Sequence, residues 1–394
     1  MPEGATDHPT YRGPAFLSYG FRPFFLSAAL FAGLAIPAWV LIHAGAGHPS
    51  FFYAARDWHV HEMLFGFLPA VMTGFLLTAI PNWTDRPPVR GMPLLLMLLV
   101  WLAGRMVIAL PGPAPLVIVV VDGTFLILLA TIVLREIIAG KAWDRSPIGV
   151  LISLYASANI LFHVLALKGA ETDLPERMAF AFIMMLLTLI GGRITPTFTG
   201  EYLTQHGLED VPLDFSRVDG LSIMLAGAAA VSWISQPQAM VTGWLLLTAG
   251  AVNLLRLSRW RGWTTWREPL VLILHLGYGW VALSMLALGA AILGLGLQPP
   301  DAVHALTTGA VGSMTLAVMT RATLGHTGRP RHADTTTVII YLLANLGALL
   351  RVFGTTTGLS TNVALGLAAA AWSSAYLLFA VIYGPYLSRP GIDE

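Results

Sequence analysis

Residues 115–138, PLVIVVVDGTFLILLATIVLREII, form an apolar run that is long enough to cross a lipid bilayer. A transmembrane helix needs about 20 apolar residues to span roughly 30 Å of hydrocarbon, and we identify twelve such runs. Only 11% of the 394 residues are charged and the mean hydropathy is +0.71. The sequence therefore predicts an all-α integral membrane protein with twelve transmembrane helices. The predicted spans are residues 24–44, 58–80, 92–110, 115–138, 147–167, 176–195, 218–235, 239–257, 269–294, 302–322, 335–353 and 363–384.

The connections between these spans are short, so we expect one polytopic membrane domain over residues 1–394. The Lys and Arg residues decide its orientation. With a cytoplasmic N-terminus, seventeen of the 22 lie on the cytoplasmic side, four lie on the opposite side, and Arg105 lies within the third span. Because short cytoplasmic loops carry an excess of Lys and Arg, both termini are predicted to be cytoplasmic.

Composition limits the chemistry. The chain has no cysteine, which excludes disulfides, thiolate-bound iron–sulfur clusters and covalently attached c-type haem. Any metal must be held by histidine, methionine, carboxylate or backbone oxygen. A net charge of +1 and the absence of a basic run argue against nucleic-acid binding.

Three spans end alike, in AIPNWT, RITPTFT and ATLGHT. Counting back 23 residues from the last threonine of each gives His61, Glu176 and His304. These are spans two, six and ten, and their spacing predicts three pseudo-equivalent groups of four helices. The alternative is that threonines and small residues are simply common in membrane helices.

The segment Trp58–Met63 is the richest in chemistry. At about 100° per residue, His59 and His61 point to nearly opposite faces of a helix. His59 and Glu62 share a face, so the carboxylate could orient that imidazole. Ionisable side chains at this depth usually face a functional interior. The alternative is an interfacial belt of tryptophan and histidine that meets lipid head groups.

Two further histidines lie on the same predicted side of the bilayer as His61. His304 opens span ten and is followed by a partly polar stripe, which is typical of a helix that faces a cofactor or water. Its alternative role is at a helix start beside Asp301. His163 ends span five with Asn159 one turn before it, and it could equally be a lone loop-side histidine.

Arginines on that side could bind the two propionates of haem b, because Arg makes bidentate contacts to carboxylates. Arg105 and Arg351 are the candidates, although a salt bridge from Arg105 to Asp122 is equally compatible with the sequence. At the cytoplasmic ends, Arg193 and Arg321 are either functional or head-group anchors. His326 lies before a Gly and a Pro, which is typical of a helix C-terminus.

Several motifs, taken in order, resemble the NnrS family over essentially the whole chain. They are GFRPFFL (20–26), WHVHEMLFGF (58–67), GFLLTAIPNWT (74–84), GGRITPTFT (191–199) and HALTTGAVGSMTLAVMTRATLGHTGRP (304–330). The resemblance implies a bacterial inner-membrane protein that is associated with haem and copper, responds to nitric oxide, and is linked to denitrification and nitrosative stress. The functional positions it implies are His59, His61, Glu62, Arg193, His304, Arg321, His326 and Arg329.

Together these residues predict a haem b held by His61 and His304 near the extracytoplasmic leaflet, where nitric oxide is bound or reduced. Glu62 is the expected proton donor, and His59 with His163 the expected ligands of a second metal. The twelve helices also resemble haem–copper oxidases and nitric oxide reductases, in which spans two and ten hold a haem. The alternative is a non-enzymatic haem- or copper-handling protein, a sensor or a transporter. If the protein is an enzyme, the sequence does not indicate its electron donor.

Overall fold

The computed structural model describes residues 11–45, 53–110, 112–208, 211–212 and 215–392. These residues form helices and no strands, and twelve helical stretches are long and apolar enough to cross a membrane. The predicted fold class is confirmed. Helices are the expected solution, since a segment in hydrocarbon must satisfy its backbone hydrogen bonds internally.

Nine spans are single helices and three are interrupted by π-helical turns. The single helices are α1 (Phe21–His43), α4 (Met92–Ala109), α5 (Pro115–Ala139), α6 (Ser146–Leu167), α9 (Arg217–Ser235), α10 (Met240–Ser258), α11 (Pro269–Ile292), α14 (Thr335–Phe353) and α15 (Thr361–Ser388). The interrupted spans are α2 (Ala55–His61), η2 (Glu62–Phe67) and α3 (Leu68–Thr84); α7 (Asp173–Leu186), η4 (Leu187–Gly191) and α8 (Gly192–Gln205); and α12 (Pro299–His304), η6 (Ala305–Val311) and α13 (Gly312–His326). Short 3-10 turns are η1 (Ala15–Leu17), η3 (Trp143–Arg145), η5 (Gly262–Thr265) and η7 (Thr355–Thr357).

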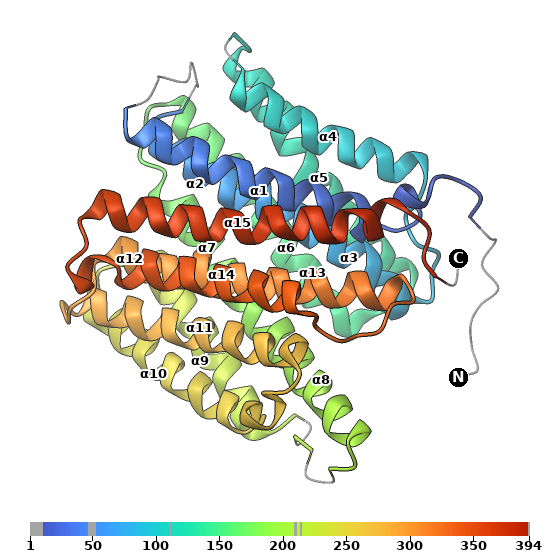
Figure 1. The fold of residues 1–394 in the computed structure, drawn as a ribbon. Coiled ribbons are helices and arrows are strands. Elements are labelled where there is room, and N and C mark those ends of the chain that lie inside the picture. Colours follow the sequence, from blue (N-terminus) through green and yellow to red (C-terminus); the bar gives the residue numbers. More distant parts are fainter. Residues whose placement is uncertain (1–10, 46–52, 111, 209–210, 213–214, 393–394) are drawn as a thin grey trace.

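The helices pack in chain order around a closed bundle. Neighbours along the chain contact one another from α4 and α5 through α6, α7, α9, α10 and α11, and α14 pairs with α15. The packing of α15 against α1 closes the bundle (Figure 1). Spans two, six and ten are buried over 83%, 61% and 72% of their most apolar stretches, as is α11 over 72%. The three interrupted spans are therefore among the most enclosed.

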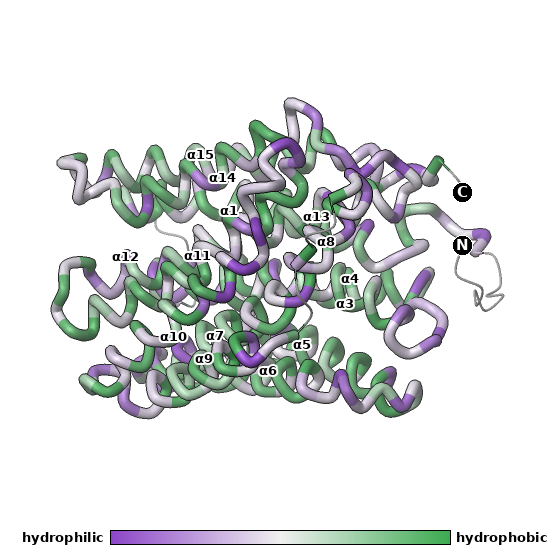
Figure 2. The backbone as a smooth tube through the Cα atoms, turned by 90° about the horizontal axis from the view of Figure 1, so that it is seen from below, coloured by the Kyte–Doolittle hydropathy of each residue, from purple (hydrophilic) through white to green (hydrophobic). Residues whose placement is uncertain are grey.

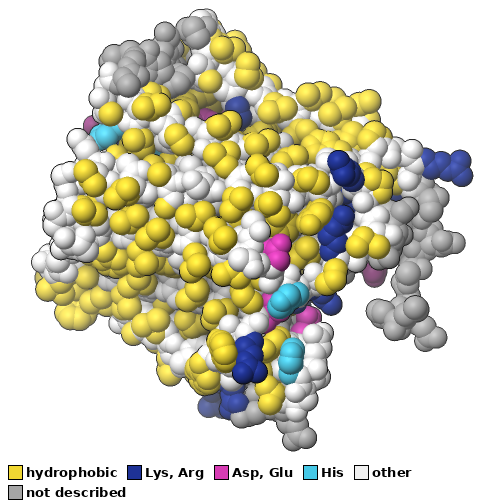
Figure 3. All heavy atoms as spheres, viewed as in Figure 1, with side chains coloured by type: hydrophobic (Ala, Val, Ile, Leu, Met, Phe, Trp, Pro, Cys, Tyr) yellow, Lys and Arg dark blue, Asp and Glu magenta, His cyan; other side chains and the backbone are white. Residues whose placement is uncertain are grey.

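The two ends of the bundle differ in chemistry. Figure 2 shows apolar residues along most of each helix, with hydrophilic ones concentrated in the connections. On the face shown in Figure 3, most Lys and Arg side chains gather toward the end that holds α8 and the C-terminal end of α15. This is the end predicted to be cytoplasmic. The helices α2 and α12 lie at the opposite end (Figure 1).

The predicted threefold repeat is matched only in part. The π-helical turns of spans two and ten begin directly after His61 and His304. In span six, Glu176 corresponds to these histidines, but the π-helix begins only at Leu187. Spans two and ten thus resemble each other more than either resembles span six.

Candidate functional site

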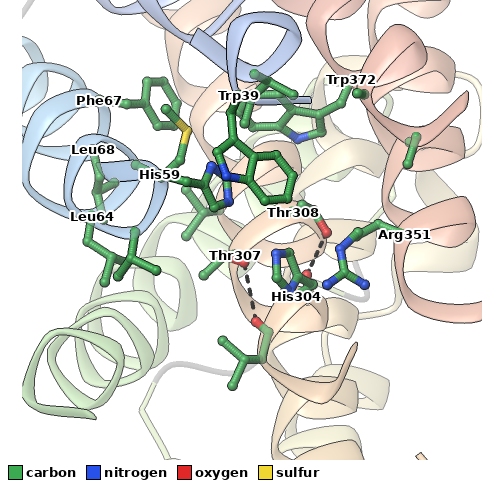
Figure 4. A pocket seen from close by; sticks show the side chains of 18 of the residues that line it. Trp39, His59, Leu64, Phe67, Leu68, His304, Thr307, Thr308, Arg351 and Trp372 are labelled. Atoms are coloured by element: carbon green, nitrogen blue, oxygen red, sulfur yellow. Dashed lines mark hydrogen bonds between the residues drawn. The ribbon is translucent and has the colours of Figure 1, made fainter. Parts of the chain in front are cut away.

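A partly open cavity lies at the end of the bundle where α2 and α12 are found. Its walls come from α1, α2, η2, α7, α12, η6, α14 and α15, and most of its lining side chains are apolar. Figure 4 shows His59, His304, Thr308 and Arg351 among them, together with two tryptophans. Enclosed apolar cavities with a few polar groups are the usual form of cofactor sites.

The rings of the two histidines that line this cavity are close together and nearly parallel. The ring centroids of His59 and His304 are 6.4 Å apart and the ring planes differ by 6°. Two imidazoles that share one metal ion, each with a metal–nitrogen bond of about 2.0 Å, have ring centroids roughly 6 Å apart. The pair therefore has the separation that one metal ion between the rings requires.

The hydrogen bonds of His304 prepare it to be a ligand. Its Nδ1 lies 2.6 Å from the carbonyl oxygen of Pro300, one turn earlier in α12, and donates its hydrogen there. Such a bond fixes the neutral tautomer whose Nε2 keeps a free lone pair. Metal-bound histidines typically donate their other N–H to a carbonyl or carboxylate in this way.

Several nitrogens around the cavity are buried without partners among the residues that the structure describes. His59 stacks on Trp39 with a centroid separation of 4.2 Å, and its Nδ1 has no hydrogen-bond partner. The indole nitrogens of Trp39 and Trp372 also have none. Buried polar groups in native proteins are normally satisfied. The nitrogens of Trp39 and His59 belong to stacked rings that line the cavity, whereas that of Trp372 is packed against Gly312.

One cation lines the same cavity. Arg351 of α14 donates from Nη1 to Asp301 at 2.6 Å, and its side chain is 20% exposed. A guanidinium has five N–H donors. The bond to Asp301 uses one of them and holds the group in place, so Arg351 retains donors for a second carboxylate.

A second constellation lies on the other side of α2. His61 is fully buried beside Asp122 of α5 and His163 of α6. The Oδ2 atom of Asp122 lies 3.3 Å from Nε2 of His61, 2.9 Å from Nε2 of His163 and 3.0 Å from the amide nitrogen of Asn159. Asn159 and His163 are four residues apart and share one face of α6. One atom each from His61, Asp122 and His163 lie within 4.8 Å of one another.

Both ring nitrogens of His61 face oxygen acceptors. Nδ1 is 3.1 Å from Glu62 Oε1, and Nε2 is 3.1 Å from Asn159 Oδ1 in addition to its contact with Asp122. A neutral imidazole can donate only one hydrogen bond. The ring must therefore carry a second proton, or a metal ion must lie between Nε2 and the oxygens around it.

The charges of this cluster lead to the same conclusion. Arg105 of α4 lies between its two carboxylates, with Nη1 2.7 Å from Glu62 and Nη2 bonded to Asp122. Two carboxylates and one guanidinium leave one excess negative charge while both imidazoles are neutral. An uncompensated buried charge is costly. One more positive charge is needed, which is either a proton held within the cluster or a metal ion.

Tyr53 completes the cluster from the segment before α2. Its hydroxyl is hydrogen-bonded to Nδ1 of His163. Burial, and after it the nearby carboxylate of Asp122, raise the pKa of this phenol above its usual value. Tyr53 therefore stays protonated and donates to His163, which in turn donates from Nε2 to Asp122.

The structure changes the predicted partnerships. His59 and His61 do point in opposite directions, as helical periodicity predicts. His304 faces His59 rather than His61, however, and His163 lies against His61 rather than His59. The expected haem pair of His61 and His304 is thus not brought together, because His61 is turned toward α5 and α6.

Two charged residues also lie elsewhere than expected. Glu62 contacts His61 and Arg105 instead of His59, because η2 begins at Glu62 and its wider turn breaks the alignment of residues three apart. Arg105 is held by two carboxylates and does not line the cavity, so only Arg351 is placed to meet propionates. The alternative of an Arg105–Asp122 salt bridge is the one that the structure has.

The candidate residues at the end predicted to be cytoplasmic do not lie together. Arg321 and His326 line a separate cavity at the far end of α13. Arg193 is exposed and outside that lining. His275 lies elsewhere, with its Nε2 3.2 Å from Thr199. These residues therefore do not form one site with the histidines near α2 and α12.

Sequence reasoning missed several contributors. Asp122 had a usable signal, since it is an ionisable residue inside the apolar run 115–138 and such residues are functional by default. Trp39, Trp372 and Tyr53 had none, because aromatic residues are common in membrane helices and near their ends. Only the packing of distant helices reveals their place in the site.

One comparison with known proteins found a match. The family model described as NnrS protein matches residues 15–390. No curated protein matches the chain.

Proposed function

The chain belongs to the NnrS family of nitric oxide response membrane proteins, and from this premise we propose that it holds a haem b between His59 and His304 and binds nitric oxide in that cavity. The observation that carries the proposal is the pair of nearly parallel imidazoles at 6.4 Å across an apolar cavity. This pairing replaces the one expected from the sequence. The site lies at the end of the bundle that we propose to face the periplasm of a bacterial inner membrane.

The residues present fit a haem in three respects. The free lone pair of His304 and the unpartnered Nδ1 of His59 provide ligand nitrogens. Arg351 and the indole N–H group of Trp39 provide donors for propionates. Apolar side chains surround them and exclude water. When bound, a haem iron held by both imidazoles would supply one-electron transfer, and it could bind the nitrogen atom of nitric oxide only in exchange for one of the two histidines.

The chain's own residues then have defined roles. The carbonyl of Pro300 holds His304 in one tautomer, and Trp39 fixes the plane of His59 by stacking. Nitric oxide is small and apolar, so it can reach the cavity from the lipid without a polar channel. Glu62 does not line the cavity. If it supplies protons, they must pass through His61, which its carboxylate contacts.

A second function, copper handling, is favoured by the buried cluster of His61, Asp122 and His163. Two imidazoles and a carboxylate suit Cu(II), which binds nitrogen and oxygen ligands most strongly among the divalent first-row metals. A metal ion there would supply the cation that the cluster requires, and it would take the place of the hydrogen that Nε2 of His163 otherwise donates to Asp122. Consumption of nitric oxide by purified protein with a chemical reductant supports a reductase. Tight metal binding without turnover supports a handling protein.

The haem assignment is tested by His59→Ala and His304→Ala, with His61→Ala as the contrast. His206→Ala, at an exposed position near the other end of the bundle, is the matched control. We expect haem content, measured from the absorption spectrum of purified protein, to fall at least roughly tenfold in the first two variants, because each would remove a side chain proposed to hold the haem iron. His61→Ala and His206→Ala should retain it.

The opposite pattern, in which His61→Ala loses haem and His59→Ala keeps it, would restore the pair expected from the sequence. Wild-type haem content in all three site variants would refute a histidine-bound haem in this part of the protein. A normal elution profile in size-exclusion chromatography separates loss of haem from misfolding.

A further inference from the structure

A second large cavity lies at the opposite end of the protein from the histidine pair. It lies between α1, α3, α8, α11 and α13, and continues along the segment after α13. Three arginines line it, Arg321, Arg329 and Arg331, together with His326 and Asn82. No Asp or Glu is part of its lining among the residues that the structure describes.

Arg321 distinguishes this cavity from an ordinary ring of anchoring arginines. Anchoring arginines extend toward water and head groups, whereas the side chain of Arg321 is only 12% exposed. Its guanidinium lies 3.8 Å from the ring centroid of Phe198, and Nη2 donates to Glu201 at 3.2 Å. Glu201 itself is 42% exposed, so it compensates the charge of Arg321 only weakly.

The other two arginines add positive charge, and neither forms an ion pair with a carboxylate of the described chain. Arg329 donates to the backbone oxygen of Thr327, and its guanidinium lies 4.0 Å from the ring centroid of Tyr386. Arg331 is exposed at the rim. Three guanidinium groups against the carboxylates of Glu201 and the nearby Glu268 leave a net positive charge, which an anionic ligand would balance.

The inner wall is apolar. Phe25 of α1, Phe75 of α3 and Phe198 of α8 all line the cavity. The cavity therefore has an arginine-lined part and an apolar inner wall. A ligand that fits both carries a compact anionic group beside the arginines and an apolar portion between the helices. Basic pockets between transmembrane helices on the cytoplasmic side are where anionic phospholipid head groups bind.

We propose that this cavity binds the phosphate group of an anionic phospholipid, with Arg321 at its floor and Arg331 at its rim. Arginine matches phosphate geometry through two parallel N–H donors. The proposal is independent of the haem, because none of these residues lines the other cavity.

The full-length protein in a neutral detergent provides the test, with bound lipid counted by native mass spectrometry and affinity taken from thermal stabilisation. The probes are phosphatidylglycerol, phosphatidylcholine and glycerol phosphate. We expect phosphatidylglycerol to bind wild type and its affinity to fall about tenfold in Arg321→Gln and in Arg331→Gln, since each loses charge-assisted hydrogen bonds. Arg193→Gln removes an exposed arginine near the same end, outside the lining, and should bind like wild type.

Each outcome decides the proposal. Loss of binding in the two cavity variants supports a phosphate site, and the better probe, lipid or glycerol phosphate, identifies its source. An equal loss in Arg193→Gln would indicate general attraction to a basic surface and overturn the proposal. Equal binding of phosphatidylcholine would overturn it as well. Arg331 is exposed, so its variant remains informative if Arg321→Gln fails to fold.

Discussion

At the scale of single residues, the direction of two histidines decides the chemistry. His59 and His61 are two positions apart on one helix, so one turns toward the cavity and the other toward α5 and α6. Helical periodicity alone predicts this divergence. It does not predict the partner of each ring, because His304 and Asp122 come from distant helices whose packing has no local signal.

The buried cluster provides a prediction at this scale. Asp122→Asn keeps the shape of the side chain but removes the negative charge that both His61 and His163 contact. We expect copper affinity to fall at least about tenfold, as measured by titration of metal-free protein with Cu(II). In wild type the affinity should rise with pH, because the metal ion replaces the second proton of His61.

A matched control and a contradictory result can both be named. Asp301→Asn changes an acid beside the other cavity and should leave copper affinity unchanged. Copper binding that is equally strong in Asp122→Asn and wild type, or independent of pH, would show that the cation of the cluster is only a proton.

At the scale of elements, the sequence predicts the spans well and their interruptions not at all. The predicted span 92–110 corresponds to Met92–Ala109, because an apolar run and its charged or proline-rich ends define a membrane helix. The π-helical turns after His61 and His304 add one residue to a turn without changing composition. Hydropathy cannot detect them, although π-turns often mark functional sites.

The π-helical turn η2 also packs against α4. A Cβ atom on Gly66 would collide with Nη1 of Arg105, which Glu62 and Asp122 hold in place. Trp101 of α4 donates to the carbonyl of Gly66 at 2.9 Å. Glycine at this position therefore permits the close approach that brings Arg105 to the carboxylates.

Gly66→Ala should consequently destabilise the protein by about 1–3 kcal/mol through overpacking. The measurement is the midpoint of thermal unfolding in detergent. Gly366→Ala, where nothing lies within 4 Å of the added atom, serves as the control and should be neutral. Equal stability of both variants would mean that Arg105 can move aside freely, contrary to its placement between two carboxylates.

At the scale of the whole molecule, the sequence predicts twelve helices and an orientation, while the structure adds which ends carry which sites. The histidine pair and the basic cavity lie at opposite ends of span ten, since His304 begins it and His326 ends it. The orientation of the protein therefore decides which compartment each site faces. Charge distribution predicts that the histidine pair faces away from the cytoplasm.

The absence of cysteine makes this orientation directly measurable. Thr356→Cys, in the connection between α14 and α15, should react with a membrane-impermeant maleimide in cells with a permeabilised outer membrane, because that connection is predicted to face the periplasm. Thr204→Cys, at the end of α8, should react only after the inner membrane is broken. Both threonines are exposed, so each variant should fold and label in detergent. If only Thr204→Cys is labelled in cells whose inner membrane is unbroken, the topology is the reverse of the predicted one. The histidine pair would then face the cytoplasm, and the basic cavity would lose its access to the cytoplasmic leaflet on which the lipid proposal depends.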